Sequence, residues 1–203
     1  MDHLIAALQR HQYAALEDQH QKGRASVALI LRHGDQGIEM LLIQRAKHPQ
    51  DPWSGNLGFP GGRIDPGDAT AYDAAVRETH EEVGLHLAQQ DYVVRLDDHH
   101  GVRIPVCVSC FVFSIADNAG ELEKNYEVSN AFWVPLRTLQ DPDKHHLATV
   151  SWHGKSIAVP GIDLGDELPV LWGLTYRFIR HFFTVIGEPL SDCPQGPRHD
   201  ALP

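Results

Sequence analysis

Hydrophobic residues cluster along the chain in short runs that are typical of β-strands. Residues 26–32 and 38–45 are rich in Leu, Ile and Val, and a polar connection with two glycines separates them, which predicts a β-hairpin. Further runs of this kind are bounded by Gly, Pro, Asp and Asn, and they predict strands at residues 92–96, 102–114, 131–134, 148–152 and 156–159.

Three segments have a helical pattern instead. Residues 2–20 are weakly amphipathic and predict an N-terminal helix, and the mostly apolar residues 171–186 predict a core helix. The third helix is expected at residues 70–83, because Thr70 can cap its start and Gly84 can end it. Its apolar positions recur every three or four residues, so this face should be buried while the charged side chains point elsewhere: Tyr72, Ala75, Val76, Thr79 and Val83.

The length and composition indicate one soluble globular domain with extensions. The 203 residues are 42% hydrophobic and 22% charged, which excludes collagen-like, coiled-coil and disordered classes. We expect an N-terminal helical extension at residues 1–22, one globular domain at 23–187 and a Pro-rich tail at 188–203.

The net charge of −10 disfavours nucleic acid and anionic membranes as partners, so neither is expected. No apolar run is long enough to span a bilayer, and the first residues lack the pattern of a signal peptide. Three cysteines do not make a disulfide framework. A cytoplasmic location is therefore expected.

Acidic residues are concentrated on the helix expected at residues 70–83. Glu81 and Glu82 follow Glu78 by three and four positions, so the three carboxylates share one face of the helix. At about 5 Å and an effective dielectric constant near 20, each pair would cost roughly 3 kcal/mol before salt screening. A divalent cation would reverse that cost, and oxygen ligands favour Mg²⁺ or Mn²⁺. A solvated acidic surface without a metal is the alternative explanation.

A glycine pair lies upstream of this helix, in the irregular segment 46–62. Gly61 and Gly62 would let backbone amides approach an anion, and Arg63 adds a planar donor suited to phosphate. Irregular loops on rigid scaffolds often carry function. We therefore expect these three residues to contact a substrate.

The spacing of these residues resembles the Nudix box. That motif reads Gly, five residues, Glu, seven residues, then Arg-Glu-hydrophobic-any-Glu-Glu-any-Gly-hydrophobic. Here Gly62 begins the motif, Asp68 stands at the usual Glu, one additional residue precedes Arg77, and Thr79 takes the hydrophobic place. The resemblance covers residues 62–85 and implies an α/β fold, the Nudix-type α/β/α sandwich around a mixed β-sheet.

The same resemblance implies roles for the acidic residues in a Mg²⁺- or Mn²⁺-dependent diphosphatase. Glu78 and Glu82 would bind the metal, Glu81 would be a further ligand or the base that activates water, and Arg77 would orient Glu81. The participation of Asp68 stays open, because the additional residue shifts its register.

Two residues outside the motif are further candidates. Glu127 precedes a late strand, where many Nudix enzymes place an acidic catalytic residue, but an ordinary surface glutamate would read the same way. Arg45 ends a strand and could reach a substrate phosphate, or it could form a structural ion pair.

Several segments resemble the coenzyme A diphosphatase branch of the family: residues 41–45, 59–62 and 171–175, together with the additional residue inside the box. That branch usually has Thr where Ile43 stands, and it spaces an Arg and a Gly differently around residues 53–57. The implied substrate is a small-molecule diphosphate, coenzyme A or a derivative, with a phosphopantetheine and adenosine 3′,5′-bisphosphate as products. ADP-ribose, other nucleoside diphosphate derivatives and nucleoside triphosphates are alternatives.

Other functions are weighed against this one. A non-catalytic Nudix module could bind a nucleotide as a sensor or scaffold, and a purely structural acidic domain would leave the glycine pair without a purpose. The 14 histidines, including adjacent pairs at 99–100 and 145–146, are interpreted as surface residues, and Trp133, Trp152 and Trp172 as packing residues. Trp53 is expected to contact a base or pantetheine arm. A homodimer formed through the N-terminal helix or residues 145–169 is possible on the sequence alone.

Overall fold

The chain folds around one mixed β-sheet in the computed structural model, which describes residues 1–16, 23–48, 51, 53–102, 105–116, 120–152, 154–165 and 167–191. Within these residues the strand order is β3-β2-β1-β7-β5, with β4 paired to β1, β8 to β2 and β6 to β7. The strands of this sheet are β1 (Arg24–Gly34), β2 (Gly37–Arg45), β3 (Leu57–Gly58), β4 (Gly61–Arg63), β5 (Tyr92–Arg95), β6 (His99–His100), β7 (Cys107–Ser114) and β8 (Val128–Pro135).

The centre of the sheet is apolar on both faces. Along β1, Ala28 and Ile30 join one apolar cluster, while the alternating Leu29 and Leu31 join the other. β1 pairs with β7 in parallel and with β2 in the antiparallel hairpin that the sequence predicts. Each cluster is closed by helices on its own side of the sheet.

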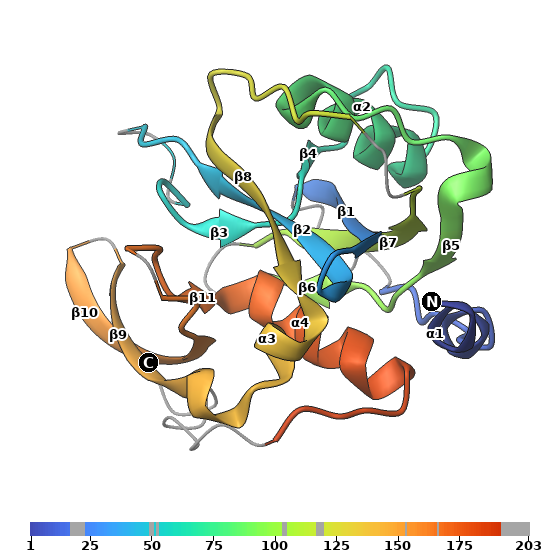
Figure 1. Ribbon diagram of the computed structural model, residues 1–203. Coiled ribbons are helices and arrows are strands. Elements are labelled where there is room, and N and C mark those ends of the chain that lie inside the picture. The colour runs from blue at the N-terminus through green and yellow to red at the C-terminus, as the bar shows by residue number, and fades with distance from the viewer. Residues whose placement is uncertain are drawn as a thin grey trace.

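The helices form the outer layers. α2 (Ala71–Val83) covers one face, and α3 (Leu136–Gln140) and α4 (Gly173–Val185) lie on the opposite side, as Figure 1 shows. Two 3₁₀ turns, Gln89–Asp91 and Pro142–Lys144, precede β5 and β9. The predicted α/β/α sandwich around a mixed sheet is thereby confirmed.

The predicted N-terminal helix is too long. α1 spans only Asp2–Leu8, and residues 11–16 have no helix or strand, while residues 17–20 lie outside the described residues. The segment leaves the helix because it bonds to the turn after β5. The Nε2 atom of His11 lies 3.0 Å from a carboxylate oxygen of Asp97, and the amide of Ala14 donates to the same oxygen at 2.7 Å.

A second sheet of three strands lies beside α4 within the described residues: β9 (His145–Trp152), β10 (Lys155–Ile162) and β11 (Leu171–Trp172). The predicted core helix at 171–186 therefore starts two residues late, because Leu171 and Trp172 pair with β10. β9 and β10 pair with each other, and β10 also pairs with β11 just before α4, so these strands pack within the molecule. No helix in the described part of the chain is both long and apolar enough to cross a bilayer.

Two histidines predicted at the surface lie inside the structure. His145 is buried, and its Nε2 atom is 2.8 Å from the carbonyl oxygen of Leu139. His99 is half-buried, and its ring packs edge-on against Phe178 in α4 with centroids 4.6 Å apart. The surface interpretation was wrong for both, because these segments pair as strands and carry side chains toward the core.

Candidate active site

Helix α2 is fixed at both ends by the residues that the sequence indicates. The hydroxyl oxygen of Thr70 accepts from the amide of Asp73 at 3.2 Å and caps the first turn. Gly84 has a φ of 71°, and its N–H donates to the carbonyl of His80, which ends the helix. Buried Ala75 and Val83 anchor the helix to the sheet. The three glutamates thus have defined positions.

Glu82 is buried rather than solvent-facing. Its side chain is 1% exposed, and one carboxylate oxygen accepts from the amide of Gly61 at 2.8 Å. Nη1 of Arg45 lies 3.8 Å from the other oxygen. Burial raises the pKa of Glu82 to about 8, because the ionised form loses its hydration and the Gly61 amide and Arg45 only partly compensate. The prediction that every charged side chain of this helix points away from its buried face is wrong here.

The glycine pair makes room for the acidic side chains of α2. A Cβ atom on Gly62 would lie 2.5 Å from Cδ of Glu78, and one on Gly61 would lie 2.3 Å from the carbonyl oxygen of Ser26. Both glycines belong to β4, which pairs with β1. Because the Gly61 amide already donates to Glu82, the anion that it binds is a carboxylate of the protein.

Arg77 connects the acidic residues. Its Nε and Nη2 atoms donate to the two oxygens of Asp68 at 2.9 Å each, and Nη1 donates to Glu78 and Glu81 at 3.0 Å each. Nη2 also donates to the carbonyl of Arg63 at 3.2 Å. The bidentate contact with Arg77 lowers the pKa of Asp68 to about 2. The additional residue in the box therefore still leaves Asp68 in contact with Arg77.

The three glutamates differ in exposure. The side chain of Glu78 is 15% exposed and that of Glu81 is 52% exposed, whereas Glu82 is buried. Burial raises the pKa of Glu78, and the charges of Glu81 and Glu127 add to this effect while Arg77 opposes it. Glu127 is therefore close enough for its charge to influence Glu78.

Arg45 has a partner that sequence reasoning missed. Its Nε atom donates to Asp51 at 2.8 Å, and the other oxygen of Asp51 accepts from the amide of Trp53 at 2.9 Å. This ion pair directs Arg45 toward Glu82. Asp51 lies in an irregular Pro- and Gly-containing segment without periodicity, so no sequence signal linked it to Arg45.

A cleft of about 720 Å³ adjoins these residues. Its polar wall includes Arg45, Asp51, Arg63, Glu78 and Glu127, and both glycines of β4 also line it. Arg77, Glu81 and Glu82 are not among its lining residues, and Glu82 lies behind Gly61. The cleft thus brings together most of the predicted site residues, with Glu82 and Arg77 supporting them from α2.

Two tryptophans add aromatic surface to the cleft. Trp53 and Trp172 line it, and the ring centroid of Trp53 lies 4.7 Å from that of Trp152 and 6.2 Å from that of Trp172. The indole N–H of Trp172 donates to the side chain of Asn56 at 3.4 Å. Trp172 is therefore a cleft residue as well as a packing residue, while Trp133 stacks against Arg32.

The donor set fits a hard divalent cation. Glu78 and Glu82 offer carboxylate oxygens that burial deprives of water, and Gly62 leaves the space that Glu78 occupies. In the described structure, no set of three oxygens, one from each of Glu78, Glu81 and Glu82, lies within 4.8 Å of one another.

Comparison with known proteins gives the family. The NUDIX domain model matches residues 22–153. A probable nudix hydrolase of Schizosaccharomyces pombe is 29% identical over 168 residues, and a mitochondrial Nudix hydrolase of Arabidopsis thaliana is 25% identical over 191 residues. The alignments cover 80% and 88% of this chain but only 55% and 65% of those relatives, so the chain spans less than two thirds of their length.

A solved structure supports the fold. The crystal structure of a MutT/nudix family protein from Enterococcus faecalis superposes with a TM-score of 0.56 at 14% sequence identity, covering 92% of this chain and 70% of that one. The matched family model includes every residue of the box at 62–85 as well as Arg45 and Glu127. This chain belongs to the Nudix family.

Proposed function

We propose that this chain hydrolyses a diphosphate linkage in a nucleotide derivative with the help of Mg²⁺ or Mn²⁺, and that coenzyme A or one of its derivatives is the substrate. The observation that carries the proposal is the pair Glu78 and Glu82, two carboxylates with raised pKa values beside a cleft that also presents Arg45 and Arg63. Such a pair costs free energy without a cation and becomes favourable with one.

Each residue of the site has a distinct task in this proposal. Glu78 and Glu82 hold the metal, which when bound supplies positive charge that offsets the charge on the phosphate oxygens. Arg45 and Arg63 bind the diphosphate from the cleft wall. Arg77 fixes the orientation of Glu81, whose exposed carboxylate can accept a proton from the attacking water.

Glu127 is the second candidate for the base. It lines the cleft from the loop before β8, whereas Glu81 lies on the edge of α2 and bonds to Arg77. Replacing each glutamate by glutamine separates the two roles, because the base is the one whose loss removes the acidic limb of the pH–rate profile.

The choice of coenzyme A as substrate is supported by the lining of the cleft, because the segments that resemble the coenzyme A branch lie far apart in sequence but line the same cleft. Leu57–Gly58 and Phe59 form one side of it, and Trp172, Leu174 and Thr175 form the other. The hydroxyl of Thr175 donates to the carbonyl of Leu57 at 3.4 Å, which joins the two sides. An elongated substrate with a diphosphate and an apolar arm matches a cleft that is lined by both charged and aromatic side chains.

A panel assay tests the substrate. Steady-state kcat/KM is measured with Mg²⁺ for coenzyme A, ADP-ribose and deoxynucleoside triphosphates, and we expect at least about a tenfold preference for coenzyme A. Equal rates on ADP-ribose would refute the substrate choice but not the hydrolase. Phosphorus NMR of products formed in ¹⁸O-labelled water would then identify the attacked phosphorus. Coenzyme A bound but recovered intact would instead support a non-catalytic binding module.

Matched variants test the site. Glu78→Gln should abolish turnover of every substrate in the panel, while Glu188→Gln, an exposed residue that bonds to Gln140, should leave it unchanged. Full activity of Glu78→Gln would contradict the proposed metal ligation.

A further inference from the structure

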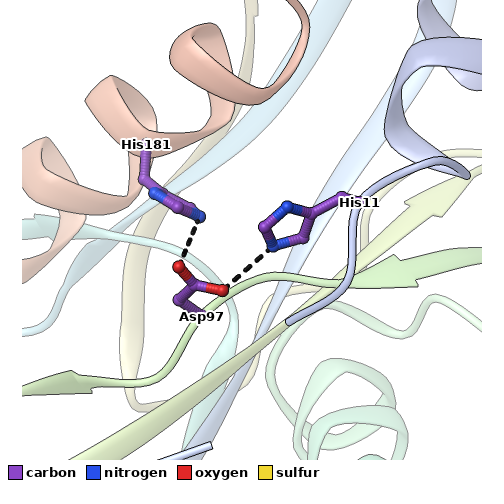
Figure 2. A group of neighbouring side chains, drawn as sticks. All are labelled: His11, Asp97 and His181. Atoms are coloured by element: carbon purple, nitrogen blue, oxygen red, sulfur yellow. Dashed lines mark hydrogen bonds and ion pairs between the residues drawn. The ribbon is translucent and has the colours of Figure 1, made fainter. Parts of the chain in front are cut away.

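Three potential metal ligands from remote parts of the chain meet outside the cleft. His11 follows α1, Asp97 follows β5, and His181 lies on α4, and Figure 2 shows both rings directed at the carboxylate. Nε2 of His11 lies 3.0 Å from one oxygen of Asp97, and Nε2 of His181 lies 3.5 Å from the other. One ligand atom from each of the three lies within 4.8 Å of the others.

We propose that His11, Asp97 and His181 form a second metal site, separate from the acidic residues of α2, that binds Zn²⁺ and fastens the N-terminal segment to α4. Two imidazoles and one carboxylate favour Zn²⁺ over Mg²⁺, which prefers oxygen ligands. This inference does not depend on the proposed hydrolysis.

The distances suit a tetrahedral ion. With bonds of about 2.0–2.1 Å to nitrogen and oxygen, neighbouring ligand atoms of a tetrahedral Zn²⁺ site lie roughly 3.3 Å apart. The observed separations are of similar size: the nitrogen of His11 lies 3.0 Å from one oxygen of Asp97 and that of His181 lies 3.5 Å from the other, and one ligand atom from each residue lies within 4.8 Å of the others. Small side-chain rotations would therefore admit the ion, and a water molecule could complete the coordination.

The surroundings favour a bound cation. Nε2 of His181 is buried and makes no hydrogen bond within the described residues, so an ion would satisfy an atom that the protein leaves without a hydrogen bond. The amide of Ala14 donates to Asp97 at 2.7 Å and fixes the carboxylate, as partners behind metal ligands commonly do.

Neighbouring charges leave the site open. His99 lies beside His181 with ring centroids 5.7 Å apart, and its Nδ1 atom lies 3.2 Å from Nη2 of Arg177. Arg177 also donates to the carbonyl of His100 at 2.8 Å. The guanidinium is thus engaged on the β6 side rather than with Asp97.

The site would influence the cleft through α4. His181 lies one turn beyond Phe178, and Phe178 and Thr175 line the cleft from the same helix. An ion that links α4 to the N-terminal segment would hold this wall in place. It would therefore stabilise the fold without contacting substrate.

Metal titration of the full chain tests the site. Protein stripped with EDTA is dialysed free of chelator and titrated with ZnCl₂ in excess MgCl₂, which keeps hard oxygen sites occupied, and CoCl₂ serves as a spectroscopic probe. We expect one equivalent of Zn²⁺, visible d–d absorption from bound Co²⁺ and a higher melting temperature with Zn²⁺. No stoichiometric binding, or binding without a visible Co²⁺ spectrum, would overturn the proposal.

Variants locate the ion. His11→Gln and His181→Gln should each weaken Zn²⁺ binding by at least about tenfold and remove the thermal shift, because each deletes one ligand. His33→Gln replaces an exposed histidine elsewhere and should bind as the wild type does. His11 lies outside the helices and sheets, so its variant keeps the test valid even if His181→Gln does not fold. Undiminished binding by His11→Gln would refute the site.

Discussion

Replacing Gly62 by alanine should remove activity while leaving the fold intact. The added Cβ atom would lie 2.5 Å from Cδ of Glu78, whereas ordinary contact begins at 3.4 Å, so the carboxylate must move by about 1 Å. The obstacle is the end of a flexible side chain, and Gly62 does not have a left-handed φ, so the backbone can stay in place. The substitution therefore acts on the position of a proposed metal ligand.

The size of the effect follows from that displacement. A misplacement of about 1 Å in a catalytic arrangement costs roughly 100-fold in rate, so kcat/KM should fall by about two orders of magnitude. Stability should change by less than about 1 kcal/mol, because alanine lowers the entropy of the unfolded chain and this offsets the rearrangement of Glu78. For a chain of this size, that corresponds to a shift in melting temperature of at most about 4 °C.

The neighbouring glycine provides the contrast. A Cβ atom on Gly61 would lie 2.3 Å from the carbonyl oxygen of Ser26 and 2.6 Å from Cα of Val27, and Gly61 has a φ of 150°. Backbone atoms cannot move aside as a side chain can, so Gly61→Ala should cost about 3 kcal/mol of stability as well as activity.

The assay compares both variants in one series. Steady-state kinetics with Mg²⁺ is measured beside thermal unfolding with EDTA. Gly62→Ala should be inactive and stable, and Gly61→Ala should be inactive and unstable. Wild-type kcat/KM in Gly62→Ala, or equal destabilisation of the two variants, would refute the reasoning.

Three further predictions concern single residues. Asp68→Asn should lower kcat by roughly tenfold with little change in KM, because it weakens the bidentate contact that positions Arg77; an unchanged kcat would count against that role. Trp53→Ala should raise KM for coenzyme A more than for a nucleoside triphosphate, and equal effects on both would show that the indole does not contact the arm. Burial and the charges of Arg177 and His181 lower the pKa of His99 to about 4, so the unfolded state takes up the proton at a higher pH than the folded state does. With EDTA present, the free energy of unfolding should therefore fall by about 2 kcal/mol between pH 6.5 and 4. Denaturant titrations should show a flatter dependence of that free energy on pH for His99→Gln.

The local structure of the site could be predicted from sequence. Thr70 and Gly84 end α2 where their chemistry indicates, and the glycine pair lies beside the acidic helix. These features depend on residues close together in the chain, whose backbone preferences are strong. The hairpin of β1 and β2 follows for the same reason.

Contacts between distant segments could not be predicted in this way. The pairing of Arg45 with Asp51 depends on the path of an irregular loop, and the meeting of His11 with His181 depends on where the N-terminal segment lies after α1. The loop has no period that fixes where its side chains point, and the weak helical period of residues 2–20 does not hold beyond α1, which ends at Leu8. Sequence reasoning therefore missed Asp51 and treated the histidines as surface residues.

The buried position of Glu82, by contrast, had a signal in the sequence. Ala75 and Thr79 define the buried stripe of α2, and Glu82 falls seven residues after Ala75 on that same stripe, while Glu81 falls beside it. The exposed fractions of the side chains agree with these positions, at 1% for Glu82 on the stripe and 52% for Glu81 beside it. A carboxylate that helical periodicity places among apolar residues is costly unless it has a partner, so its position on the stripe indicates function more strongly than the number of acidic residues does.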